Sequence, residues 1–138
     1  GGQGETAIRD CVVKRYPRDS FILTDKLSDS LFNSEDEIRP LFEKQLESCG
    51  VDYFDFYLLH SQTKAIFEKY KKLHAYEHAF ELKKEGKVKL PTHKDNISNY
   101  RSSSIEKATD SELFRVSGFS LKTRLHSGTI YVYKRNFS

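Results

Sequence analysis

A histidine and a lysine stand near the ends of two short apolar runs in this chain. His60 follows residues 54–59, which are apolar or aromatic apart from Asp55, and Lys26 comes two positions after residues 20–24. Short apolar runs of this kind are typical of strands buried on both faces of a parallel sheet. Active-site groups in such sheets lie at the carboxyl ends of the strands. We therefore expect Lys26 and His60 to be the groups that could do chemistry.

The residue types alone leave a plainer alternative open. Most lysines of globular proteins are solvated at the surface, and histidines at strand ends are common. Taken by themselves, Lys26 and His60 fit a solvated lysine and a structural histidine better than a catalytic pair. Asp55 lies between aromatic residues and is interpreted as a hydrogen-bonded structural group. His74 and His78 have helical i, i+4 spacing, but without a further ligand they predict a surface helix face and no metal site.

The elements that would position these residues alternate along the first 90 residues. Helical spacing of apolar residues predicts three helices, and the runs between them predict strands. Pro40 lies inside the second helix, so we expect a kink there or a helix start shifted towards it. In chain order the predicted elements are a helix over 5–16, a strand over 20–24, a helix over 34–49, a strand over 51–59, a helix over 65–85 and a short strand from Val88. This alternation is typical of βαβ units in a parallel α/β sheet.

Composition narrows the class of protein. With 138 residues of which 37% are hydrophobic, the chain can bury a core of its own. Apolar runs stay far shorter than the 18 residues or more of a membrane span, and the first residues do not resemble a signal peptide. The two cysteines, Cys11 and Cys49, lie on apolar helical faces. They predict buried free thiols and a cytoplasmic location.

The chain changes character near Pro91. Residues 91–138 carry eight Lys or Arg against four Asp or Glu, whereas residues 1–90 are close to neutral. An alternating stretch over 118–125, a turn at 126–128 and a β-forming stretch over 129–133 predict an antiparallel β-hairpin. The polar and aromatic side chains of this basic hairpin are Lys122, Arg124, His126, Tyr131, Tyr133, Lys134 and Arg135.

The basic hairpin suggests an alternative function for the chain. A non-enzymatic module could use it to bind a nucleic-acid backbone or a protein. Solvated strand faces explain the charge equally well, and no known base-reading motif accompanies it. We therefore do not favour a nucleic-acid partner.

Five segments in order resemble the aldo-keto reductase family. They are residues 1–5, 21–27, 37–46, 50–60 and 82–88, and the resemblance extends over residues 1–89. The Gly1-Gly2-Gln3 opening looks most similar to bacterial members that carry an iron–sulfur extension. The resemblance implies a partial (β/α)8 TIM barrel with parallel strands.

The resemblance also implies a function. The family moves a hydride between NADP(H), sometimes NAD(H), and a small carbonyl or alcohol substrate. Lys26 and His60 match the lysine and histidine of its Asp-Tyr-Lys-His tetrad, which makes both catalytic candidates. The lysine lowers the pKa of the tyrosine, which acts as general acid, and the histidine orients the carbonyl. The matching Asp and Tyr would lie before Gly1, outside this chain, and the cofactor-binding residues remain unknown.

The family pattern divides the chain into two predicted segments. Residues 1–90 are predicted to be a truncated barrel segment, and residues 91–138 an unrelated basic tail. Such a segment is expected to be inactive alone and to need a complementing barrel fragment as partner. A partial parallel sheet also leaves edges that a closed barrel would pair. We expect the tail hairpin either to cover one edge or to remain mobile.

Overall fold

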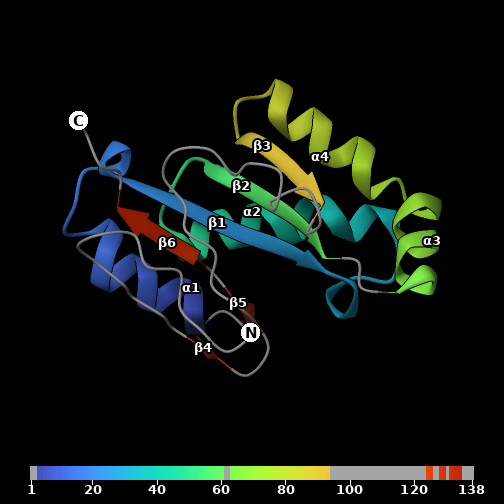
Figure 1. Cartoon of the computed structure of the whole chain (residues 1–138), viewed down its shortest axis with the longest axis horizontal. Helices are drawn as coiled ribbons and strands as arrows, with labels where there is room; N and C mark the ends of the chain where they lie inside the picture. Colours follow the sequence, from blue (N-terminus) through green and yellow to red (C-terminus); the bar gives the residue numbers. More distant parts are fainter. Residues whose placement is uncertain (1–2, 61–62, 94–123, 126–127, 130, 135–138) are drawn as a thin grey trace.

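A parallel sheet of three strands forms the centre of the molecule. The computed structural model describes residues 3–60, 63–93, 124–125, 128–129 and 131–134. Strands β1 (Phe21–Ser28), β2 (Phe54–His60) and β3 (Val88–His93) run parallel, and β6 (Tyr131–Lys134) lies antiparallel beside β1. The order across the sheet is β3-β2-β1-β6 (Figure 1). The predicted partial α/β barrel segment is confirmed in its three parallel strands.

Helices connect the parallel strands. After α1 (Gln3–Ile8) and β1, α2 (Ile38–Cys49) leads to β2, and α3 (Lys64–Lys72) with α4 (Ala75–Lys84) leads to β3. Short 3-10 turns occupy Arg18–Ser20, Asp29–Leu31 and Glu35–Glu37. Because α2 begins at Ile38, Pro40 falls in its first turn, where the missing N–H removes no helical hydrogen bond. The predicted shift of the helix start towards Pro40 is confirmed.

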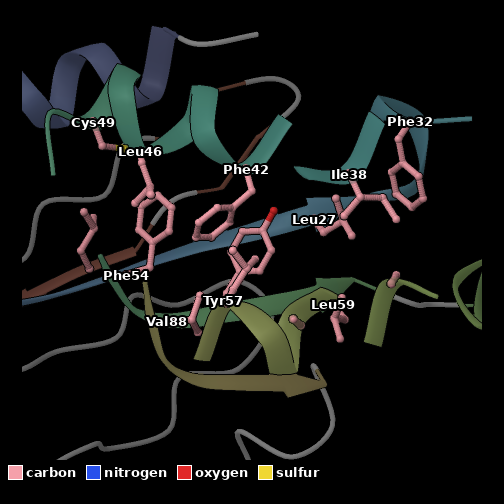
Figure 2. Packing of buried hydrophobic residues seen from close by; sticks show 14 of the residues in the cluster. Leu27, Phe32, Ile38, Phe42, Leu46, Cys49, Phe54, Tyr57, Leu59 and Val88 are labelled. Carbon is pink, nitrogen blue, oxygen red and sulfur yellow. The ribbon is translucent and has the colours of Figure 1, made fainter. Parts of the chain in front are cut away.

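Aromatic packing holds α2 against the sheet. The Phe42 ring of α2 lies 5.7 Å from the Phe54 ring and 4.9 Å from the Tyr57 ring, both edge to face. Figure 2 shows this cluster between the helix and the strands. The Tyr57 hydroxyl donates to Gln45 Oε1 at 2.7 Å, and Gln45 Nε2 donates to the Lys26 carbonyl at 3.0 Å. Helix α2 is therefore bonded to both β1 and β2.

Gly50 ends α2 and turns the chain into β2. Its φ of 67° is left-handed, a conformation that glycine adopts without a Cβ penalty. The Gly50 N–H donates to the Glu47 carbonyl, and the Val51 N–H donates to the Leu46 carbonyl. The predicted end of this helix at residue 49 is confirmed.

Strand β6 covers the open edge of β1. Its pairing runs from Phe21↔Lys134 to Thr24↔Tyr131, so β6 pairs with the first half of β1, whereas the ladder with β2 begins at Thr24. This confirms the expectation that the tail covers one edge. Strands β4 (Arg124–Leu125) and β5 (Gly128–Thr129) pair antiparallel across the predicted turn. Of the predicted second strand, Tyr131–Lys134 pairs with β1 in the main sheet. Residues 118–123 of the predicted first strand lie outside the described residues.

The first helix differs from the prediction. Arg9–Val13 form a π-helical turn, in which the Lys14 N–H donates to the Arg9 carbonyl at 3.0 Å. Since this turn is wider than an α-helical one, Ile8 and Val12 face the core while Cys11 turns outwards. The prediction of a buried Cys11 is therefore wrong, and the prediction of a buried Cys49 is confirmed.

The helix predicted over residues 65–85 is two helices. The break lies at His74, whose φ of 52° is left-handed and cannot continue an α-helix. The change of direction brings Tyr70 and Ala79 into the core. Phe67 and Phe80, two aromatic residues of the predicted helix, remain 39% and 57% exposed.

Candidate active site

Lys26 and His60 lie on neighbouring parallel strands. Strand β1 continues past the predicted end at residue 24, because its ladder with β2 runs from Thr24↔Phe56 to Ser28↔His60. Lys26 is therefore inside β1, two positions before the residue that pairs with His60. Strand spacing and rise place the two Cα atoms about 8 Å apart.

Both side chains belong to one face of the sheet. Lys26 and Ser28 alternate onto the same face, and His60 shares that face because it pairs with Ser28. Asp25 and Tyr57 pair on the opposite face, where Tyr57 contacts Phe42 of α2. Lys26 and His60 thus lie on the face away from α2, and both are half-buried.

Hydrogen bonds fix the main chain around both residues. The Lys26 N–H donates to Asp25 Oδ1 at 2.8 Å, and the Lys26 carbonyl accepts from Gln45. The Tyr70 hydroxyl lies 2.7 Å from the carbonyl oxygen of Leu27 and 3.1 Å from that of His60. Tyr70 lies within the helix predicted over residues 65–85, and the sequence pattern does not mark it as a site residue. A buried tyrosine needs a hydrogen-bond partner for its hydroxyl, and this requirement could have indicated the role of Tyr70.

Asp25 is close to Lys26 in sequence but outside the site. Its side chain is buried on the α2 face, and its Oδ2 atom has no hydrogen-bond partner. Burial raises the pKa of the Asp25 carboxyl to about 8, against an ordinary value of 3.8. The group is thus a buried, largely protonated acid at neutral pH.

Asp55 has the structural role predicted for it. Its Oδ2 accepts from the Leu23 N–H at 2.9 Å and from Arg18 at 2.8 Å, and Lys89 Nζ lies 3.2 Å from Oδ1. Burial acts to raise the pKa of Asp55, but these hydrogen bonds outweigh it and the net pKa is lowered. Asp55 therefore joins β1, β2 and β3.

The paired histidines of α4 lie at the surface and share a carboxylate. His74 Nδ1 is 2.9 Å from Glu35 Oε2, and His78 Nε2 is 3.1 Å from Glu35 Oε1. Hydrogen bonding to Glu35 raises the pKa of His74, and His74 in turn lowers the pKa of Glu35. Among the described residues, no group of three or more His, Cys, Asp or Glu side chains is arranged to hold a metal ion.

Comparison with known proteins identifies the family. The model of the Aldo/keto reductase family matches residues 1–123. This chain belongs to the aldo/keto reductase family. The match extends past residue 90, where we expect the barrel segment to end, and that boundary stays a prediction. The likeness to bacterial members with an iron–sulfur extension also stays a prediction.

Curated relatives of this aldo/keto reductase chain share part of its sequence. NAD(P)H-dependent D-xylose reductase of Aspergillus niger is 42% identical over 60 residues, which is 43% of this chain and 18% of the relative. The 4-dihydromethyl-trisporate dehydrogenase of Mucor mucedo is 46% identical over 54 residues, which is 39% of this chain and 16% of the relative. The match thus spans under a fifth of these curated relatives.

Solved structures of the family share the fold. An aldo/keto reductase from Brucella melitensis has a TM-score of 0.51 and 26% identity, over 64% of this chain and 34% of that protein. An aldo-keto reductase from Bacillus halodurans in its holo form has a TM-score of 0.50 and 24% identity, over 72% of this chain and 36% of that protein. The described part of this chain thus corresponds to about a third of a family fold.

The described residues fit only part of a nicotinamide site. Lys26 and His60 supply a cation and an imidazole on one face. Lys69 donates its ammonium hydrogens to the Asp29 and Phe32 carbonyls and is thereby committed to the protein's own backbone. None of the described helices combines the length with the apolar character that a membrane crossing requires.

Proposed function

We propose that this chain contributes part of the active site of an NAD(P)H-dependent oxidoreductase that acts on small carbonyl or alcohol substrates. The observation that carries the proposal is the register that aligns Ser28 with His60, which brings Lys26 and His60 to one face. The names of relatives such as the NAD(P)H-dependent D-xylose reductase agree with it. NADP(H), when bound, supplies or accepts the hydride.

The two residues would have different tasks. His60 would donate a hydrogen bond to the substrate carbonyl and orient it. Lys26 would place a positive charge near a tyrosine hydroxyl and lower its pKa, because a nearby cation favours the phenolate. In the family pattern that tyrosine, which is the general acid, comes from outside these residues.

We further propose that these residues are inactive without the rest of the barrel. Loss of a general acid typically costs about 10²–10⁴ in rate. The match covers about a third of its solved relatives, and we propose that the remaining barrel strands, whichever polypeptide carries them, complete the site. Both cysteines are free thiols, which suits a reducing cytoplasm.

An amide NMR titration with NADPH tests the proposed site. Addition of NADPH to the full chain is expected to shift the signals of Lys26, His60 and their strand neighbours. The variants Lys26→Met and His60→Gln should weaken these shifts. Lys44→Met is a matched control, because Lys44 is an exposed lysine on α2 and should leave the titration unchanged. A well-dispersed spectrum that does not respond to NADPH would overturn the proposal.

The basic tail remains the alternative site of function. The pairing of β6 with β1 gives this part of the tail a structural task, which favours the oxidoreductase proposal over a free binding hairpin. Binding of a labelled DNA or RNA duplex that weakens steeply with salt would favour the alternative, since phosphate contacts release counterions. No binding at low salt would exclude a nucleic-acid role.

A further inference from the structure

We propose that Tyr70 is a positioning residue that holds the strand ends carrying Lys26 and His60 in register. This inference rests on the proposed function, because it gives Tyr70 a purpose only if Lys26 and His60 act together. Tyr70 lies on α3, outside the sheet, and none of its atoms needs to contact substrate. Its role would be exerted through the main chain of β1 and β2.

One hydroxyl bridges the two strands near their carboxyl ends. Tyr70 Oη lies 2.7 Å from the carbonyl of Leu27, the residue after Lys26, and 3.1 Å from the carbonyl of His60 itself. A tyrosine has a single hydroxyl hydrogen, so the two carbonyls share it, and the shorter contact to Leu27 is the stronger bond. The bridge thus constrains the relative position of the two residues that the proposed site needs.

Burial makes this bridge effective. Tyr70 has no exposed surface, and water therefore does not compete for its hydroxyl. Burial also raises the pKa of Tyr70, so the hydroxyl stays a neutral donor. Strand-end carbonyls that are shielded from water need such a donor, because an unpaired buried carbonyl is costly.

The neighbouring residue extends the bridge to the loop after β1. Lys69 Nζ donates to the Asp29 carbonyl at 2.5 Å and to the Phe32 carbonyl at 2.6 Å. The Lys69 ammonium also lies 4.7 Å from the centroid of the Phe32 ring, and the Phe32 and Tyr70 rings are 5.5 Å apart. Two successive residues of α3 therefore fix the segment that follows Lys26 and the end of the strand that carries His60.

The chain offers a matched control for removal of the hydroxyl. Tyr76 lies beside Tyr70, with ring centroids 6.3 Å apart, but its buried hydroxyl has no hydrogen-bond partner. Tyr70→Phe removes both contacts of the bridge, whereas Tyr76→Phe removes a hydroxyl of the same kind that bridges nothing. An effect seen in Tyr70→Phe but not in Tyr76→Phe is therefore caused by loss of the bridge.

Backbone NMR relaxation of the full chain measures the effect. In the wild type and in Tyr76→Phe, Leu27 and His60 should have order parameters near the rigid value of about 0.85. In Tyr70→Phe, we expect both values to fall towards about 0.6, while Leu23 and Phe54 at the opposite ends stay rigid. Unchanged values in Tyr70→Phe, or an equal loss in Tyr76→Phe, would overturn the proposal.

A measurement on the wild type keeps the test valid if Tyr70→Phe does not fold. Exchange of the Tyr70 hydroxyl hydrogen for deuterium should shift the carbonyl ¹³C signals of Leu27 and His60, and an absent shift at both carbonyls would contradict the bridge. The test of the bridge and the NADPH test of the proposed function can fail independently. Loss of the NADPH response with an intact bridge would overturn the function alone, and a rigid Tyr70→Phe variant that still responds to NADPH would overturn the bridge alone.

Discussion

The Arg18 guanidinium donates to the Asp55 carboxylate at 2.8 Å and so ties the turn before β1 to the start of β2. The same guanidinium donates to the Phe21 and Tyr53 carbonyls and stacks 3.8 Å from the centroid of the Tyr53 ring. Asp55 is only 3% exposed, so this ion pair lies largely away from water. It couples the two strands at the end opposite to Tyr70.

Replacement of Arg18 should destabilise the fold strongly. Arg18→Met leaves the buried Asp55 carboxylate without its main cation, and breaking a buried pair costs about 3–5 kcal/mol. Because Lys89 still lies 3.2 Å from Asp55, we expect a loss near the lower limit, about 3 kcal/mol, in the free energy of unfolding by urea. Lys14→Met, which breaks an exposed pair with Asp10, is the control and should change little. Equal losses in both variants would contradict this prediction.

The buried Asp25 should make the protein less stable as the pH rises. Its pKa of about 8 in the folded state exceeds its ordinary value of 3.8, so the folded protein binds one more proton than the unfolded chain between these values. Stability therefore falls from about pH 4 to about pH 8, by an amount on the order of 5 kcal/mol.

Asp25→Asn isolates that effect, because the amide does not ionise. The free energy of unfolding of Asp25→Asn, measured by urea at pH 5 and pH 8, should differ much less than that of the wild type. At pH 8 the variant should be the more stable protein. A wild-type stability that is the same at both pH values would show that the Asp25 carboxyl is not held as a neutral acid.

The contact between His74 and Glu35 should add a smaller pH dependence. The Glu35 carboxylate raises the pKa of His74, so the contact stabilises the fold fully below about pH 6.5 and is lost as the pH rises through the raised value. Glu77 also favours the charged His74. In Glu35→Gln, the NMR titration of the His74 ring should move to lower pH. A midpoint that does not move would mean that Glu35 does not hold the imidazolium.

Removal of β6 should expose a sheet edge. Deletion of residues 124–138 leaves the backbone of Phe21–Thr24 without the partner that β6 provides, and unpaired edges promote association between chains. We expect lower stability and larger species in light scattering after size exclusion. Deletion of residues 135–138 alone, which spares β6, is the control and should stay like the wild type. A monomeric and equally stable protein without residues 124–138 would show that β6 is dispensable.

The local pattern of the sequence was sufficient for much of the scaffold. The apolar run before His60 predicted β2, and Gly50 predicted the end of α2, since strand burial and left-handed glycine caps depend on neighbours in the chain. Together with the family segments, these local signals also identified Lys26 and His60 as the candidate pair. The structure brings them to one face because His60 pairs with Ser28 and Lys26 stands two positions before Ser28 in the same strand.

Only the tertiary structure decided the features that depend on distant contacts. The π-helical turn that exposes Cys11, the left-handed His74 that divides one predicted helix into two, and the pairing of β6 with β1 have no local signature. The bridge from Tyr70 to Leu27 and His60 joins residues 43 and 10 positions apart. Such contacts form because buried polar groups must find partners wherever the packed chain supplies them, and periodicity along the sequence does not carry that information.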